Sequence, residues 1–512
     1  MNDPILAADS DPAAATTGGA TDEIACLRAI ADWLNVRHPA QPRDELEALR
    51  GHLLALREIA ATNDERAALL ERLFDRALPL INALTPSLLD HELPLPRSTG
   101  RTLRVMHELL WQLAADLPAA SALGDAAHDG EAATAAIRSG GALWRSVDAL
   151  AQHLLLSYLT ASPASSGVWL ALHQRHVQAV RLGLAEHIPA AATRSLRQVY
   201  NAALLVACAH PAALTAREIS FVAAFAERFA GQVDAPSAQA PAGSATFWID
   251  PLRDQPPAPL ARRAPPPDSG ALFFSCAALA TLVERHMTAA GDAAIDTSLP
   301  ATAITPEQRG TLRHLLNCWG APRKRRFLRR RQSSRAQLCA GLTAVIAALR
   351  GQDSAPLSDW MIINESADGY AVMHVGGDSG PLAVGEVVAV RCSEDDRGKD
   401  RHWQIAMVRW AISENPEHLE LGLQIVAPLA LPALLALPAS GTTQAALLLP
   451  AAPPLHERTK LLIAAAALPA VEEKLIVVVD SGRVDVRELH IAHTEELTPS
   501  LALFAVQSDE RV

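Results

Sequence analysis

Aromatic residues are scarce in this 512-residue chain: they make up 4% of it, while alanine and leucine supply much of the apolar content. Because alanine and leucine are strong helix formers, this composition favours a protein with a large helical part. The six cysteines are scattered and form no C-x-x-C pair. This spacing argues against a disulfide framework and a cysteine-rich zinc site, and it is typical of buried thiols in a reducing cytoplasm.

An excess of positive charge is also missing, since the formal net charge is -11. A general nucleic-acid binder needs basic surface over much of a domain, so binding of DNA or RNA is not expected. The first twenty residues lack the basic start and apolar core of a secretory signal peptide. The most apolar run, Ala427 to Ala439, is too short to span a bilayer and contains three prolines. We therefore expect a soluble, cytoplasmic protein with no transmembrane segment.

Catalytic signatures are absent as well. The sequence contains no Walker A loop, no nucleophile elbow, no Rossmann fingerprint and no H-E-x-x-H pair of metal ligands. Four histidines fall on predicted helices, and none of them forms a two-ligand spacing with a carboxylate, although His173 and His176 are three residues apart and could share a face. We expect all four to be polar surface positions: His153, His173, His176 and His187. An enzyme, a metal site and a bound cofactor are therefore not expected.

The first half of the chain has helical periodicity. Residues 1–20 are small, acidic and glycine-rich, and we expect them to form a disordered tail. Across residues 21–233, apolar side chains recur at helical spacing. One of these stripes consists of Leu46, Leu49, Leu53 and Leu56. Several stripes, separated by proline and glycine, predict an all-α domain built as an array of antiparallel helices.

Proline interrupts this pattern after the helical domain. Residues 234–268 are rich in proline, alanine and arginine, with Phe247-Trp248-Ile249 as an isolated apolar island. Because the proline runs cannot form a helix and have few donors for a sheet, this stretch predicts an interdomain linker. Residues 269–320 then predict a strand followed by helices that connect the linker to the rest of the chain.

The apolar period changes from helical to alternating in the second half. Short strand-like runs separated by turn residues fill residues 321–428 and predict a small antiparallel β-barrel or sandwich, in which only Gly341–Arg350 has a helical pattern. Beyond an apolar connector, the same rhythm returns in residues 440–512 and predicts a second, C-terminal β unit. The expected fold class is therefore multidomain α + β, with an all-α array preceding two β units.

Two short motifs lie within the first β unit. Eight of the thirteen residues from Arg323 to Arg335 are basic, which indicates a docking surface for an anion in an otherwise acidic chain. Downstream, the segment Asn364–Gly369 has the pattern N-x-S-x-x-G at the end of a predicted strand. Its glycine permits either a hairpin turn or the close approach of a flat ligand. Each motif is unspecific by itself, since the arginine run fits nucleic acid, an acidic membrane or a phosphate ligand.

Together and in this order, the motifs resemble the PilZ domain, a bacterial receptor for the second messenger cyclic di-GMP. The resemblance covers residues 321–428 and implies that an R-x-x-x-R pair holds the ligand. Two registers fit: Arg325 with Arg329, which the family pattern favours, and Arg326 with Arg330. Arginine suits both ends of such a ligand, because it holds a phosphate bidentately and also donates to the edge of guanine.

The resemblance gives the second motif a role as well. It implies that Asn364 and Ser366 on the barrel wall form hydrogen bonds with base or phosphate groups, and that Gly369 keeps the wall low beside the purine. The C-terminal unit contains neither motif. If it too is PilZ-like, it is a degenerate copy with a structural role.

The function implied is that of a receptor or adaptor in signal transduction. We expect cyclic di-GMP to order the arginine-rich loop and to reorient the helical domain, which then presents or hides a surface for a protein partner. Two alternatives stay open. In one, a ligand-free PilZ-like scaffold recruits proteins through its helical domain; in the other, the arginine tract binds RNA or an anionic membrane by charge alone.

Overall fold

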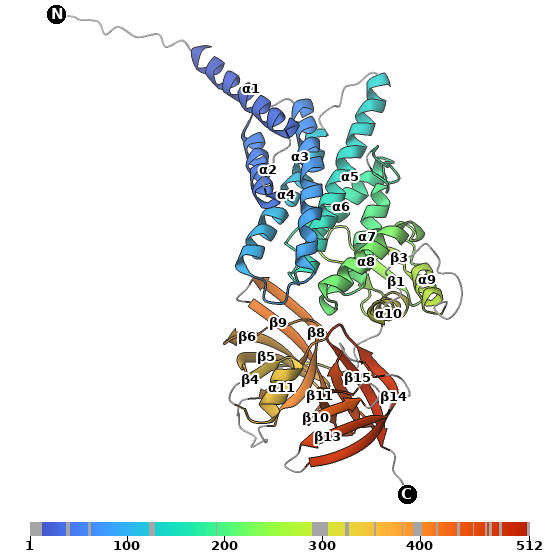
Figure 1. Cartoon of the computed structure of the whole chain (residues 1–512). Helices are drawn as coiled ribbons and strands as arrows, with labels where there is room; N and C mark the ends of the chain where they lie inside the picture. The colour runs from blue at the N-terminus through green and yellow to red at the C-terminus, as the bar shows by residue number, and fades with distance from the viewer. Residues whose placement is uncertain are drawn as a thin grey trace, which may run out of the picture. The chain divides into compact units, whose positions relative to one another are not determined.

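Figure 1 shows the computed structural model of the chain. It describes residues 13–36, 41–59, 63–121, 129–190, 192–288, 306–322, 327–352, 355–380, 382–392, 402–415, 418–437, 441–453, 455–465, 468–469, 474–480 and 484–508. The chain folds as two compact units that alternate along the sequence. The first comprises Met1–Pro86, Arg101–His153 and Ala171–Tyr200, and the second comprises Ser87–Gly100, Leu154–Leu170 and Asn201–Val512.

Helices fill the chain as far as Gln232. In order they are α1 (Ala13–Asn35), α2 (Pro42–Glu58), α3 (Asn63–Leu84), η1 (Thr85–Leu88), α4 (Arg97–Ser121), α5 (Asp129–Leu159), α6 (Val168–Arg181), α7 (Leu196–Cys208), η2 (Pro211–Ala213), α8 (Ala216–Phe229) and η3 (Ala230–Gln232). The predicted stripe on α2 is buried at all four leucines, so the predicted helical array is confirmed. Within the described part of the chain, none of the helices has the length and apolar character that a membrane span requires.

Part of the predicted disordered tail is helical. Helix α1 already begins at Ala13, because alanine favours helix even in a segment that carries glycines. Residues 1–12 of that predicted tail lie outside the described residues.

Three of the histidines predicted to be surface positions are buried instead. In the first unit, the ring of His153 stacks on that of His107 with centroids 4.2 Å apart. The ring of His176 stacks on Tyr200 at 4.0 Å, and Nδ1 of His173 lies 2.7 Å from the Tyr200 hydroxyl. These contacts place the imidazoles within the helical core as packing groups, a role that helical spacing alone does not show.

The buried histidines predict acid-sensitive stability. Burial lowers the pKa of His107 to about 3 and lowers the pKa values of His153 and His176 to about 4. Below pH 6.5 the unfolded chain takes up protons that the folded chain does not. Each histidine therefore lowers the free energy of unfolding by about 1.4 kcal/mol per pH unit until its folded pKa is reached. Urea unfolding at pH 7 and pH 5 should show a clear loss of stability.

A matched variant tests the cause of this loss. His176→Phe keeps the flat ring beside Tyr200 but removes the titrating group, so its stability should fall less between pH 7 and pH 5 than that of the wild type. Equal losses in the two proteins would show that His176 is not responsible.

The stretch predicted as a linker forms part of a folded sheet. Strand β1 (Thr246–Ile249) lies between β2 (Ala258–Pro259) and β3 (Leu272–Ser275) in a three-stranded antiparallel sheet. The whole of β1 is buried, and the indole of Trp248 donates a hydrogen bond of 2.6 Å to the Arg263 carbonyl. The apolar island in 234–268 thus marks a strand, because burying its aromatic side chains outweighs the surrounding prolines. The other domain boundaries drawn from the sequence stay predictions.

The described residues of the connector after this sheet form helices where the sequence predicted them. It contains α9 (Ala277–Thr288), α10 (Pro306–Leu315) and the π-helix η5 (Leu316–Gly320). Trp319 anchors the last of these, since its side chain is fully buried and donates to the Leu205 carbonyl at 3.2 Å.

The first β unit is a closed six-stranded antiparallel barrel, which confirms the predicted barrel. Its strands are β4 (Arg330–Ala340), β5 (Ser358–Ser366), β6 (Gly369–Gly376), β7 (Val387–Cys392), β8 (Gln404–Asn415) and β9 (His418–Ala427), in the spatial order β4-β5-β6-β9-β8-β7. Alternate side chains such as Trp360, Val372 and Leu421 fill the interior. The remaining alternate positions face outwards and are free to carry polar groups.

The second β unit has the same topology. Its strands are β10 (Leu431–Leu437), β11 (Thr442–Leu449), β12 (Lys460–Ala464), β13 (Leu475–Asp480), β14 (Val484–Leu497) and β15 (Leu501–Ser508), in the closed order β10-β11-β12-β15-β14-β13. When the strands of each barrel are counted along the chain, the spatial order around both barrels is first, second, third, sixth, fifth, fourth. The barrel begins earlier than predicted, because β10 lies inside the proline-containing run that was taken as a connector.

A short helix joins the cores of the two barrels. Helix α11 (Leu342–Leu349) lies where the sequence predicted a helix and follows β4 of the first barrel. Its buried Val345 and Ile346 belong to one hydrophobic cluster with Leu447 and Leu462 of the second barrel. The two barrels thus share one apolar core and do not pack as independent domains.

Candidate functional site

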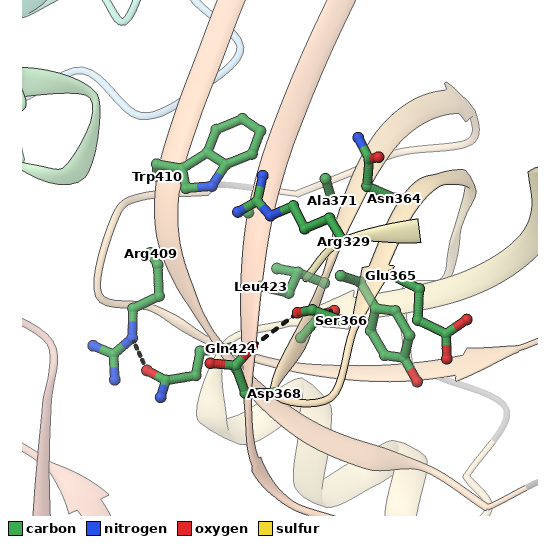
Figure 2. A pocket seen from close by; sticks show the side chains of 13 residues that line it. Arg329, Asn364, Glu365, Ser366, Asp368, Ala371, Arg409, Trp410, Leu423 and Gln424 are labelled. Atoms are coloured by element: carbon green, nitrogen blue, oxygen red, sulfur yellow. Dashed lines mark hydrogen bonds between the residues drawn. The ribbon is translucent and has the colours of Figure 1, made fainter. Parts of the chain in front are cut away.

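A pocket of about 260 Å³ lies on the wall of the first barrel (Figure 2). Side chains and backbone from β5, β6, β8 and β9, together with the residue before β4, form its lining. They are Arg329, Asn364, Glu365, Ser366, Asp368, Gly369, Tyr370, Ala371, Arg409, Trp410, Gly422, Leu423 and Gln424. Four of the predicted site residues are therefore brought together in one pocket: Arg329, Asn364, Ser366 and Gly369.

Strand register brings these residues together. Ser366 pairs with Gly369 across the β5–β6 hairpin, so the N-x-S-x-x-G motif is the hairpin itself. Gly369 in turn pairs with Gln424 on β9. A second row runs from Asn364 on β5 through β6 and β9 to Trp410 on β8. The outward alternation of the strands therefore places the polar motif beside an aromatic side chain that lies far away in the sequence.

Two glycines make the floor of the pocket flat. A Cβ atom on Gly369 would overlap the carbonyl oxygen of Leu423, so only glycine lets β6 and β9 approach this closely. A Cβ atom on Gly422 would overlap the indole of Trp410, which lies directly against that glycine. With the small Ala371 between them in the lining, these positions leave a low surface on which a planar group can lie.

The hairpin turn holds a hydroxyl and a carboxylate at the rim. The Ser366 hydroxyl lies 2.8 Å from Oδ1 of Asp368 and 3.1 Å from the Gly369 carbonyl, and Figure 2 shows the first of these contacts. Asp368 and Glu365 both line the pocket, so its wall carries two carboxylates. Carboxylates accept hydrogen bonds, so they match the donors on a nucleobase edge.

One described basic side chain of the arginine-rich segment lines the pocket. Arg329 extends over the floor with its guanidinium directed towards Trp410 (Figure 2). Arg330 begins β4 opposite Glu365 and does not line the pocket. Arg325 and Arg326 lie outside the described residues. The structure thus places one arginine of the favoured register at the site, and the choice between the two registers stays a prediction.

A second arginine, an aromatic side chain and a glutamine also line the pocket, and no sequence motif predicted them. Arg409 donates from Nε to Oε1 of Gln424 at 2.6 Å, and both side chains line the pocket beside Trp410. A β-bulge between Val408 and Trp410 changes the alternation of β8 at this point. The strand-like pattern predicted within residues 321–428 does not signal this bulge, which places two consecutive side chains at the pocket.

The phenol of Tyr370 closes the inner side of the site. It packs against the barrel interior and donates to Oε1 of Gln404 at 2.9 Å. Burial is the main reason why the pKa of Tyr370 is raised, and the carboxylate of Glu365 adds to the effect. The phenol therefore stays protonated and serves as a fixed donor within the wall.

Guanidinium groups, carboxylates and a flat floor next to an indole suit one kind of ligand. Arginines hold phosphate, carboxylates accept from a base edge, and an aromatic face beside small residues receives a planar ring. The arrangement thus fits a nucleotide better than a simple anion.

Comparison with known families agrees with this chemistry. The family model described as the N-terminal domain of the cyclic-di-GMP receptor FimW matches residues 28–238. The model described as the middle PilZ domain of the same receptor matches residues 246–354 and 346–432. No curated protein matches the chain. The matched ranges include the helical half, the three-stranded sheet and the first barrel, and they end at the start of the second barrel.

Proposed function

The chain belongs to the PilZ-domain family of cyclic di-GMP receptors, and from this premise we propose that the pocket on its first barrel binds cyclic di-GMP. One observation carries the proposal: Arg329 and the three residues of the N-x-S-x-x-G motif line the same pocket, although the helix α11 separates them in the chain. A basic tract that binds anions by charge alone would not need Arg329 and the motif residues to line one pocket.

The roles of the residues follow from the chemistry of the ligand. Cyclic di-GMP offers two phosphates and two guanines. Arg329, with a partner from the arginine-rich segment, grips a phosphate or the O6/N7 edge of guanine. Asn364 and Ser366 form hydrogen bonds with the base or the phosphate, and the floor at Gly369 receives the purine ring.

Binding then acts on the rest of the protein. Closing the arginine-rich segment over the pocket fixes the chain immediately before β4 and shifts the helical domain relative to the barrel. The helical domain presents or hides a surface for a protein partner in response. The protein is thus a cytoplasmic adaptor that relays a second messenger and performs no catalysis.

Asn364→Ala tests whether the pocket, and not charge alone, holds the ligand. We expect it to weaken cyclic di-GMP binding about tenfold, because one amide that makes one or two hydrogen bonds is lost. Gln332→Ala is the control, since Gln332 is exposed on β4 and does not line the pocket. Isothermal titration calorimetry at two salt concentrations measures both variants.

The salt dependence separates this proposal from electrostatic binding. A specific pocket predicts a large effect of Asn364→Ala and a moderate effect of salt. Binding through the arginine tract alone predicts a steep loss of affinity with salt and no response to Asn364→Ala. The second pattern would refute the proposed site.

A further inference from the structure

Arg409 contacts the pocket and the second barrel at the same time. Its Nε donates to Gln424 within the pocket, and its Nη1 and Nη2 donate to the two carboxylate oxygens of Glu496, the second of these bonds being 2.8 Å long. Glu496 lies on β14 of the second barrel, and both side chains are partly buried. One guanidinium thus links the ligand pocket to the neighbouring barrel.

The surrounding junction is close-packed. The Thr498 hydroxyl, just after β14, donates to the Gly385 carbonyl, just before β7, at 3.2 Å. A Cβ atom on Gly385 would lie 2.9 Å from the Cβ of Thr498, and Gly385 has a φ of 86°. The end of β14 therefore rests on the first barrel through backbone that tolerates no larger side chain.

The ion pair limits what Arg409 can offer to a ligand. Three of the five N–H groups of the guanidinium are committed to Gln424 and Glu496. The carboxylate also cancels the charge of the arginine beside the pocket. A phosphate gains the full bidentate interaction with Arg409 only if Glu496 releases it.

We propose that the phosphate of the cyclic dinucleotide and Glu496 compete for Arg409, so that ligand binding loosens the contact between the two barrels. This inference rests on the proposed function and names the second barrel as an element that responds to the ligand. Linkage makes the effect reciprocal: the factor by which the bound ligand weakens the Arg409–Glu496 pair equals the factor by which the closed pair weakens ligand binding.

Glu496→Gln is the direct test, with titration of cyclic di-GMP into the full chain. We expect affinity about fivefold higher than that of the wild type, because the competing charge is gone. Glu495→Gln is the matched control. It removes the same charge one residue away, from a carboxylate that pairs with Lys460 at 2.6 Å and not with Arg409, and its affinity should equal that of the wild type.

Two further measurements test whether the gain in affinity depends on Arg409 and whether the ligand affects the second barrel. In an Arg409→Ala background, adding Glu496→Gln should bring no further gain, because the group for which it competes is missing. In the wild-type protein, cyclic di-GMP should speed amide hydrogen exchange in β14.

Unchanged or weaker binding by Glu496→Gln, a gain that persists without Arg409, or unchanged exchange in β14 would each overturn the competition. If the wild type binds cyclic di-GMP but the expected effects of the variants are not seen, only the competition for Arg409 is refuted. If the wild type does not bind cyclic di-GMP, the proposed function is refuted as well.

Discussion

Arg329→Ala is expected to weaken cyclic di-GMP binding about 100-fold, because it removes from the pocket lining a guanidinium that, in the proposed complex, forms two charge-assisted hydrogen bonds with the ligand. Calorimetric titration at constant salt measures the loss. The control is Arg335→Ala, which removes the same charge from β4, the strand that follows Arg329, at an exposed position that pairs with Met361 and does not line the pocket. Equal losses of affinity in both variants would show that Arg329 contributes only its positive charge and no specific contact.

The same titration decides between the two arginine registers. If Arg329 pairs with Arg325, Arg325→Ala should weaken binding far more than Arg326→Ala. The opposite order would favour the register of Arg326 with Arg330. Binding that survives both the Arg325→Ala/Arg329→Ala double substitution and the Arg326→Ala/Arg330→Ala double substitution would remove the arginine segment from the site.

Gly369→Ala is expected to have the largest effect on the barrel itself. The new Cβ would overlap the carbonyl oxygen of Leu423, so β6 and β9 must move apart and lose ladder hydrogen bonds. We expect a loss of about 3 kcal/mol in the free energy of unfolding, together with loss of ligand binding. Urea unfolding followed by circular dichroism measures the first effect, and titration measures the second.

Gly376→Ala is the control for this substitution. Gly376 is at the other end of β6, and a Cβ atom there would meet nothing within 4 Å. Its unfolding free energy should stay within about 0.5 kcal/mol of the wild-type value. If both alanine variants were equally stable, the close approach at Gly369 would not be what shapes the floor of the pocket.

Local patterns were sufficient to predict much of the fold. The leucine stripe on α2, the helix at Gly341–Arg350 and the alternating strands of the first barrel depend on short-range periodicity, which the sequence shows directly. Long-range pairing was harder to predict. Strand β1 lies among prolines and β10 within a run of alanine, leucine and proline, and only their partners in the folded sheets make them strands.

The site shows the same division. Asn364, Ser366 and Gly369 lie close together in the sequence and form a motif, so the sequence alone could predict them as site residues. Arg409 and Trp410 reach the pocket through a β-bulge and through a register between β8 and β9 that no local pattern fixes. The shared topology of the two barrels was likewise hidden, because strand order can persist after the binding motif is lost.

Titration of cyclic di-GMP into the wild-type chain at moderate salt decides whether the pocket on the first barrel can be a cyclic di-GMP site. We expect saturable binding with a Kd in the micromolar range or below. A wild-type chain that is folded and gives no binding would show that the pocket is not such a site.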